Sequence, residues 1–260
     1  MKLAIIIPAH DEEKRIEKTL LAYASYFNKI ERDFNLKYKI IVVINASKDS
    51  TKEIVERIML KEDNISYLDL IKGGKGYAVI EGFKSAISKG YDLIGFVDAD
   101  LATSPESFYD LVNNISSIGG VLASRYVKGA KLFPQITFRR AIVSRIFNFI
   151  VRSLFMMPYR DTQCGAKLFK IQALKETIYN LGMTQWAFDI ELLYELHKKG
   201  FKIKEIPTSW TDVAYSKIKL GKTSLQMLLS VLQLRIIKSP FKKLLRPLKP
   251  IVMLLWRMSK

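Results

Sequence analysis

Residues 93–100, Leu-Ile-Gly-Phe-Val-Asp-Ala-Asp, place two carboxylates, Asp98 and Asp100, at the end of a short apolar run. The run has the length and composition of a buried strand. Similar Val- and Ile-rich runs occupy residues 3–7, 39–44, 65–70 and 121–123. Amphipathic stretches separate these runs, and this alternation predicts βαβ units and an α/β fold with a mostly parallel sheet flanked by helices.

Helical periodicity fills the segments between the strands. The expected helices cover residues 12–27, 50–60, 77–89 and 105–116. In the second half, residues 138–157 have the pattern of a basic amphipathic helix. Strands are then expected at 164–169 and 202–207, and helices at 173–180, at 188–199 and in two stretches beyond 221.

Positive charge is concentrated at the C-terminal end of the chain. The formal net charge is +17 over 260 residues, and no Asp or Glu follows Asp212. Lys and Arg recur there among aliphatic residues rather than among aromatic residues suited to base stacking. This mixture favours an anionic membrane surface over nucleic acid. The alternative is that the tail packs on the rest of the chain or on another subunit, and homo-oligomer formation stays open.

No run in the tail reaches the roughly 20 apolar residues of a spanning helix, so the chain is expected to lie on a membrane. The first apolar run, 1–8, leads directly into Asp11 and Glu12, which is not the pattern of a signal peptide. Cys164 is the single cysteine, and we interpret it as a small buried residue rather than a catalytic thiol. We therefore expect the protein on the cytoplasmic side of a membrane.

Asp98 and Asp100 are candidate ligands of a divalent metal. In an open α/β sheet, ligands bind at the carboxyl ends of the strands. Alternation along an extended strand turns the two side chains to the same side, and two hard oxygen ligands suit Mg²⁺ or Mn²⁺ bridging a diphosphate. The alternative is a solvated strand end in which Asp100 starts a turn.

Polar residues also follow two other predicted strands. Pro-Ala-His-Asp-Glu ends the first at 8–12, and Asn-Ala-Ser-Lys-Asp-Ser-Thr ends the second at 45–51. Both groups would lie where a nucleobase and ribose could form hydrogen bonds, and helix capping is the alternative for their side chains. Gly-Gly-Lys-Gly at 73–76 is a candidate phosphate loop; because it matches neither the P-loop nor the GxGxxG spacing, an ordinary turn is the alternative.

Six segments, taken in order, carry a resemblance to a known family. They are IIIPAHDEE (5–13), VVINASKDST (42–51), GGKGYAVIEGF (73–83), FVDADLATSPE (96–106), ASRY (123–126) and DTQCGAKLF (161–169). Together they resemble glycosyltransferase family 2, and within it the polyprenyl- and dolichyl-phosphate sugar synthases, nearest to the dolichyl-phosphate β-glucosyltransferases. The resemblance implies a GT-A catalytic domain over 1–212, followed by basic amphipathic membrane-associating helices over 213–260. It also implies a nucleotide sugar donor, a divalent metal and inversion of the anomeric centre.

Matched position by position, the resemblance implies a nucleotide-sugar site. Its residues are Pro8, Ala9, Asp11, Glu12, Asn45, Lys75, Asp98, Ala99 and Asp100. Asn45 would read the base, Lys75 would lie near the diphosphate, and Asp98 and Asp100 would hold Mg²⁺ or Mn²⁺. Asn45 departs from the Asp-Asp-Gly-Ser of many relatives, but an amide can still donate to and accept from a uracil or guanine edge. UDP-glucose is the favoured donor and GDP-mannose remains open.

The resemblance also places the acceptor, a polyprenyl or dolichyl phosphate. Arg125, Arg140 and Ser144 match positions that hold the acceptor phosphate, and guanidinium groups bind phosphate oxygens with two parallel hydrogen bonds. For Arg140 the alternative is a cation that faces the membrane. Asp161 would lie near the reacting centre, as a base or as an orienting group. A capping turn or an ion pair with Lys167 is its alternative.

The remaining predicted residues line the substrate pocket. They are Gln163, Trp186, Asp189 and Lys217. An acceptor phosphate needs no strong base because its second pKa is near 6, whereas a glycan hydroxyl acceptor would need Asp161 or Asp189 as a base. Three alternatives to a lipid-phosphate glycosyltransferase stay open. They are a family 2 enzyme acting on a glycan hydroxyl, a nucleotidyltransferase, and a basic binding protein without catalysis. No glycine-rich Arg/Lys signature of a nucleotidyltransferase follows the first strand.

Overall fold

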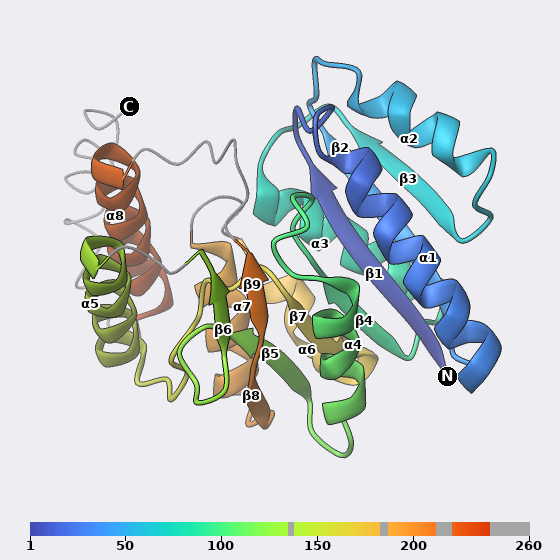
Figure 1. Cartoon of the computed structure of the whole chain (residues 1–260). Coiled ribbons are helices and arrows are strands. Elements are labelled where there is room, and N and C mark those ends of the chain that lie inside the picture. Colours follow the sequence, from blue (N-terminus) through green and yellow to red (C-terminus); the bar gives the residue numbers. More distant parts are fainter. Residues whose placement is uncertain (135–137, 183–186, 212–219, 240–260) are drawn as a thin grey trace.

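A mixed seven-stranded sheet forms the centre of the protein. The computed structural model describes residues 1–134, 138–182, 187–211 and 220–239. The sheet has the strand order β3-β2-β1-β4-β7-β5-β8 (Figure 1). The strands are β1 (Lys2–Ala9), β2 (Lys37–Asn45), β3 (Ile65–Leu70), β4 (Leu93–Phe96), β5 (Gly120–Ser124), β7 (Lys167–Lys170) and β8 (Ile203–Pro207).

The N-terminal half of the sheet is parallel, as the alternating pattern predicts. β1 pairs in parallel with both β2 and β4, and β2 pairs in parallel with β3. The carboxyl ends of β1, β2 and β4 therefore meet at one edge. β7, expected at 164–169, begins at Lys167 and runs antiparallel between β4 and β5. The predicted α/β class is confirmed.

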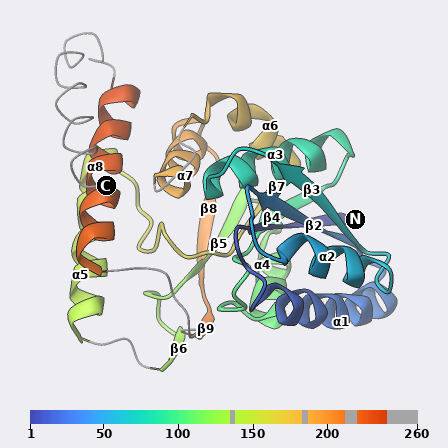
Figure 2. The ribbon, with the colours of Figure 1, turned by 90° about the horizontal axis from the view of Figure 1, so that it is seen from above.

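Helices cover both faces of the sheet (Figure 2). One face carries α1 (Ile16–Phe34), α2 (Thr51–Met59) and α4 (Pro105–Asn114). The other face carries α3 (Lys75–Ser88), α6 (Ile171–Thr177), the short 3-10 helix η1 (Ile178–Asn180) and α7 (Phe188–Lys198). Alternate residues of β1 point to opposite faces, so Ile5 joins the first core and Ile6 the second.

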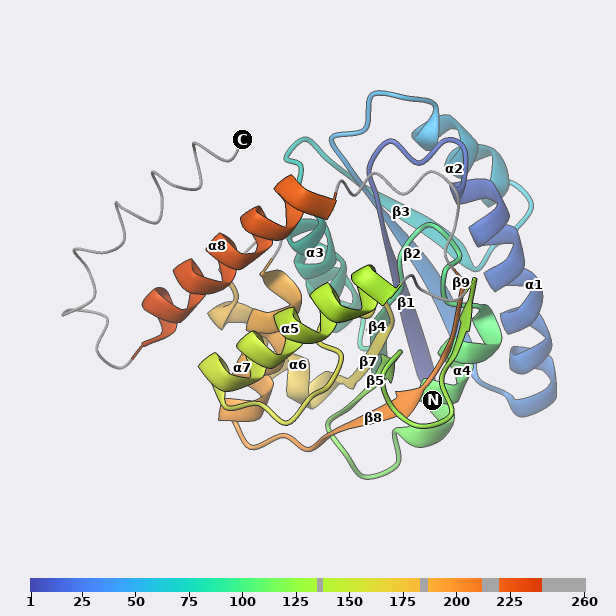
Figure 3. The same ribbon diagram turned by 60° about the vertical axis from the view of Figure 1, so that its left-hand side comes forward.

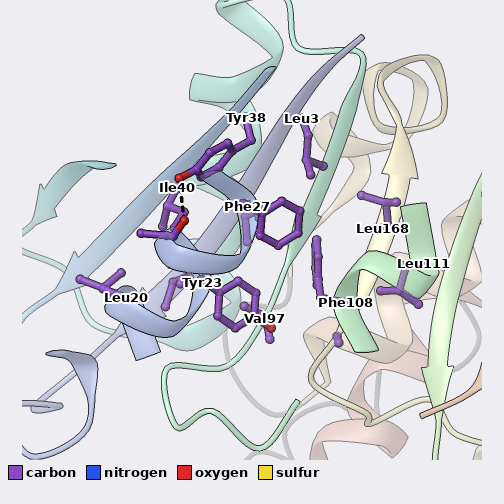
Figure 4. Packing of buried hydrophobic residues seen from close by; sticks show 14 of the residues in the cluster. Leu3, Leu20, Tyr23, Phe27, Tyr38, Ile40, Val97, Phe108, Leu111 and Leu168 are labelled. Carbon is purple, nitrogen blue, oxygen red and sulfur yellow. Dashed lines mark hydrogen bonds between the residues drawn. The ribbon is translucent and has the colours of Figure 1, made fainter. Parts of the chain in front are cut away.

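Aromatic rings fill the core between α1, α4 and the sheet. Tyr23 and Phe27 of α1 meet Phe108 of α4 there, and all three side chains are buried (Figure 4). Two side chains of α1 also hold the loop after β4: Thr19 Oγ1 donates to Ala99 O at 2.8 Å, and Tyr23 Oη donates to Thr103 O at 3.0 Å. This packing fixes the loop that carries the two aspartates.

Helix α5 (Phe138–Phe155) and helix α8 (Leu220–Lys238) lie side by side (Figure 3), at the end of the molecule away from β3 (Figure 1). A two-stranded parallel sheet of β6 (Lys131–Phe133) and β9 (Ser209–Thr211) lies beside the main sheet. The sequence pattern does not predict these two strands, because three residues are too few to show alternation.

Helix α8 belongs in part to the folded body of the protein. Val231 and Leu234 are buried, and Lys238 Nζ lies 2.8 Å from carboxylates of both Glu191 and Glu195 on α7. The alternative in which the tail packs on the rest of the chain is therefore realised for this helix. Residues 240–260, which contain the other predicted tail helix, lie outside the described residues. No helix within the described ranges is long and apolar enough to cross a bilayer.

Candidate active site

The loops after β1 and β2 are joined by reciprocal hydrogen bonds. Asp11 N donates to Ser47 Oγ at 3.1 Å, and Lys48 N donates to Asp11 Oδ1 at 2.8 Å. Glu12 N donates to Thr51 Oγ1 at 2.8 Å, while the Glu12 carboxylate pairs with Arg15. Asp49 Oδ1 accepts from Thr51 N at the start of α2 at 3.1 Å, so capping holds for Asp49. Arg15 before α1 and Ser50 before α2 make no side-chain cap hydrogen bond, and the side chains of Asp11, Ser47 and Glu12 make the contacts given above. These side chains instead stabilise a shared rim.

Asn45 is a buried connection between three segments. Its Nδ2 donates to Ala9 O at 2.8 Å, and its Oδ1 accepts from Gly74 N at 3.0 Å. Its own carbonyl lies 2.8 Å from His10 Nδ1. Gly74 has a φ of 130°, a conformation that favours glycine. Asn45 thus holds the glycine loop against the ends of β1 and β2; its base-reading role stays a prediction.

Lys75 and Asp98 form an ion pair at the centre of the site. The Lys75 Nζ–Asp98 Oδ1 distance is 2.5 Å, and both side chains are more than a third exposed. Burial alone would lower the pKa of Lys75, but the charges of Asp98 and Asp189 outweigh burial and raise that pKa. The predicted glycine loop therefore places a permanent cation beside the first aspartate.

Asp100 completes the acidic part of the site. Its Oδ1 accepts from Ala102 N at 3.0 Å, across a turn in which Leu101 has a φ of 60°. Burial and the like charge of Asp98 raise the pKa of Asp100. A divalent cation held by Asp98 and Asp100 would offset this repulsion, so the donor set fits Mg²⁺ or Mn²⁺.

Gly165 makes the closest approach to Asp98. A Cβ added at Gly165 would lie 2.0 Å from Asp98 Oδ2. The acceptor-side turn 161–165 therefore contacts the acidic centre through a backbone that has no side chain. The family resemblance predicted that the turn 161–165 belongs to the site. Its contact with Asp98 is seen only in the folded structure.

Asp161 and Arg125 form a buried, doubly hydrogen-bonded pair. Arg125 Nε donates to Asp161 Oδ2 at 2.8 Å and Arg125 Nη2 to Oδ1 at 2.9 Å, and the Asp161 side chain is 0% exposed. Burial would raise the pKa of Asp161, but Arg125 outweighs it and lowers that pKa. The suggested partner Lys167 pairs instead with Asp189, so the Asp161–Lys167 alternative is wrong.

Two of the predicted acceptor residues, Arg125 and Ser144, are connected through Tyr126. The Arg125 guanidinium lies 5.5 Å from the Tyr126 ring, and Tyr126 Oη lies 2.5 Å from Ser144 Oγ on α5. Arg140 is one helical turn before Ser144, and its side chain lies outside the described residues. Trp186 and Lys217 also lie outside them.

Several residues of the site are not apparent from the sequence alone. Glu205 of β8 accepts from the backbone nitrogens of Arg160 and Asp161, and Asn148 of α5 accepts from Thr162. The signal available in the sequence was Lys167, a lysine within an apolar strand. A buried charge requires a partner of opposite charge, so Lys167 indicated that a buried carboxylate lies nearby. Cys164 is 1% exposed and burial raises its pKa to about 11, as expected for a small buried residue.

Comparison with known proteins places this arrangement in a family. The family model for glycosyl transferase family 2 matches residues 4–178. The dolichyl-phosphate beta-glucosyltransferase of Dictyostelium discoideum is 33% identical over 243 residues, covering 90% of this chain and 73% of the relative. The Homo sapiens protein of the same name is 32% identical over 237 residues, covering 87% and 72%.

Solved structures share the fold. Glucosyl-3-phosphoglycerate synthase from Mycobacterium tuberculosis, in complex with Mn²⁺, UDP and phosphoglyceric acid, aligns with a TM-score of 0.63 at 17% identity, covering 90% of this chain and 78% of that one. A mannosyltransferase from Pyrobaculum calidifontis with GDP-Man and Mn²⁺ aligns at 0.61 and 18%, covering 96% and 68%. The expected GT-A fold is confirmed. The matched family model, the relatives and the site at the strand ends together establish that this chain belongs to glycosyltransferase family 2.

Proposed function

We propose that this protein transfers a hexose from a nucleotide sugar to a polyprenyl or dolichyl phosphate, with inversion of the anomeric carbon. The observation that carries the proposal is the Lys75–Asp98 pair beside Asp100, at the joined ends of β1, β2 and β4. The names of the relatives support glucose as the sugar. UDP-glucose is the favoured donor and GDP-mannose is the second candidate.

Asp98 and Asp100 would hold the metal, Mg²⁺ or Mn²⁺. When bound, such an ion neutralises charge on the diphosphate and on the departing nucleotide. No group of three or more His, Cys, Asp or Glu side chains with metal-binding geometry occurs among the described residues. A site with two protein carboxylates matches a cation whose remaining ligands are substrate phosphates and water.

Lys75 supplies the protein's own positive charge at the leaving group. In the transfer, an acceptor phosphate oxygen forms a bond to the anomeric carbon while the bond from that carbon to the diphosphate oxygen breaks. The nucleoside diphosphate leaves with the electron pair of the broken bond. Lys75, which pairs with Asp98, would place its ammonium charge beside the diphosphate as negative charge develops on it.

The acceptor side is built for an anion rather than for proton removal. Both oxygens of Asp161 accept from Arg125, and the pKa of Asp161 is lowered, so this carboxylate is a poor base. We propose that it orients Arg125, whose remaining N–H groups would bind the acceptor phosphate together with Ser144. A phosphate with a second pKa near 6 is already largely ionised and needs no base.

The outer face of α5 supports association with a membrane. Ile146 and Phe149 on α5 are 54% and 68% exposed, and Met156, directly after the helix, is 79% exposed. Phe149 and Met156 also line an open groove of about 470 Å³ together with Arg152. Neither α5 nor α8 contains an acidic residue. This combination suits the boundary between anionic headgroups and acyl chains, where the lipid acceptor resides, and we place it on the cytoplasmic face.

A transfer assay tests the proposal. Vesicles that contain dolichyl phosphate are incubated with the protein, Mn²⁺ and labelled UDP-glucose, GDP-mannose or UDP-N-acetylglucosamine, with and without EDTA. We expect label to enter the organic phase as an acid-labile product from UDP-glucose, and EDTA to stop the transfer. Label that appears only on a water-soluble glycan would refute the lipid phosphate acceptor and favour a hydroxyl acceptor.

A further inference from the structure

Lys167 is a completely buried lysine in the middle of the sheet. It pairs in register with Phe96 on β4, two residues before Asp98, and its side chain is 0% exposed. Its Nζ lies 2.6 Å from both Asp189 Oδ1 and Cys164 O, and 5.1 Å from the centre of the Phe96 ring. The ammonium group therefore makes two hydrogen bonds and one cation–π contact.

These contacts connect helix α7 to the acidic centre. Asp189 lies in the first turn of α7, which has no side-chain cap. The Cys164 carbonyl directly precedes Gly165, whose backbone lies against Asp98. Lys167 therefore fixes the start of α7 and the 164–165 turn relative to the carboxylate that we assign to the metal.

Asp189 has a second carboxylate oxygen, Oδ2, that makes no hydrogen bond with Lys167. Within the described residues only its Oδ1 has a hydrogen-bond partner, and its side chain is 11% exposed. Lys75, which pairs with Asp98, has its Nζ 5.9 Å from the centre of the Phe96 ring, and Lys167 Nζ lies 5.1 Å from the centre of the same ring. Asp189, which Lys167 binds, therefore lies near the cation that we assign to the diphosphate. Gln163 directly precedes Cys164 in the chain. Its Nε2 is buried and has no hydrogen-bond partner in the described part of the chain.

The chemistry of this position matches the sugar rather than either phosphate. An ionised carboxylate repels phosphate oxygens but accepts hydrogen bonds from hydroxyl groups. The hexose of a nucleotide sugar is bonded to the terminal phosphate, so it lies next to the cation that binds that phosphate. We propose that Lys167 is a positioning residue: it holds Asp189 so that Oδ2 accepts hydrogen bonds from hydroxyl groups of the donor hexose. This inference rests on the proposed function.

Calorimetry on the full chain separates sugar recognition from nucleotide recognition. The probes are UDP and UDP-glucose with Mn²⁺, and GDP and GDP-mannose in parallel. Asp189→Asn keeps an acceptor for Lys167 but replaces the ionised acceptor facing the sugar. We expect affinity for UDP-glucose to fall about 10- to 100-fold, as for loss of a hydrogen bond to a charged group, with affinity for UDP unchanged. The KM for UDP-glucose should rise by a similar factor.

Three further variants control for folding. Lys167→Met leaves the Asp189 charge buried without a partner and should lower both Tm and affinity for UDP-glucose. The double variant Lys167→Met, Asp189→Asn removes both charges; it should recover Tm but not affinity for the sugar. Lys238→Met breaks the other lysine–carboxylate cluster on α7 and should lower Tm without changing the ratio of UDP-glucose to UDP affinity.

The outcomes distinguish the two levels of inference. Equal losses for UDP and UDP-glucose in Asp189→Asn, or no loss for either, would overturn the role of Asp189 while leaving the proposed function in place. Recovery of sugar affinity in the double variant would overturn it as well. Failure of the wild-type protein to bind any of the four probes would refute the proposed function and this inference with it.

Discussion

Replacing Gly165 by alanine is expected to inactivate the protein while leaving it folded. The added Cβ would lie 2.0 Å from Asp98 Oδ2, whereas real Cβ contacts essentially never fall below 3.0 Å. Either the carboxylate or the turn must move by about 1 Å, and a displacement of that size at reacting groups lowers rates about 100-fold. Because Asp98 is 36% exposed, its carboxylate can swing toward solvent, and the free energy of unfolding should change little.

Two measurements check this expectation. The rate of sugar transfer and the affinity for Mn²⁺ in the presence of UDP should both fall, because the added methyl group displaces Asp98, a proposed metal ligand that also pairs with Lys75. Gly182→Ala is the matched control, since within the described ranges its added Cβ would meet only Glu191 Oε1, at 4.0 Å. Full transfer activity and wild-type Mn²⁺ affinity in Gly165→Ala would refute the geometry on which this reasoning depends.

Other changes test the remaining parts of the site and the membrane face. Asp100→Ala should abolish transfer with little change in Tm, because it removes a proposed metal ligand; activity in labelled-donor assays would contradict the metal assignment. Arg125→Ala should lower the free energy of unfolding by about 3–5 kcal/mol in urea titrations, because it leaves Asp161 buried and unpaired. In the wild-type protein the pKa of Asp161 is lowered, so its stabilising contribution is present above the unfolded pKa of about 3.9 and is lost as pH falls through the folded value; urea titrations at several pH values should show no loss from this pair between pH 8 and pH 5. Phe149→Asp on α5 should weaken binding to anionic vesicles in sedimentation assays, whereas Leu60→Asp, at an 88% exposed site away from α5, should not; equal effects would argue against a specific membrane face.

Local patterns were sufficient to predict the parallel half of the sheet. β1, β2, β3 and β4 all overlap the apolar runs seen in the sequence. β1, β2 and β4 are buried over nearly their whole length, and a strand buried on both faces must be apolar throughout, whereas the edge strand β3 is mostly only partly buried. The antiparallel direction of β7 could not be predicted in this way. The apolar pattern of a strand does not indicate whether it pairs in a parallel or an antiparallel way. Its direction depends on neighbouring strands that are distant in the chain.

Some residues of the candidate site could likewise be predicted from local sequence, whereas their long-range partners could not. Asp98 and Asp100 were predictable because they directly follow a strand, and Lys75 because it follows glycines before a helix. The partner of Asp161 was not: sequence proximity suggested Lys167, six residues away, whereas the fold supplies Arg125, 36 residues away.

The sequence by itself determined the fold class, the family and the residues at the strand ends, because period, composition and motif order are properties of neighbouring residues. Only the tertiary structure decided which charges meet. It paired Lys167 with Asp189 and Arg125 with Asp161, and it placed Gly165 against Asp98. The physical reason is that a buried charge takes whichever opposite charge the chain's packing brings within hydrogen-bond distance, irrespective of separation along the sequence.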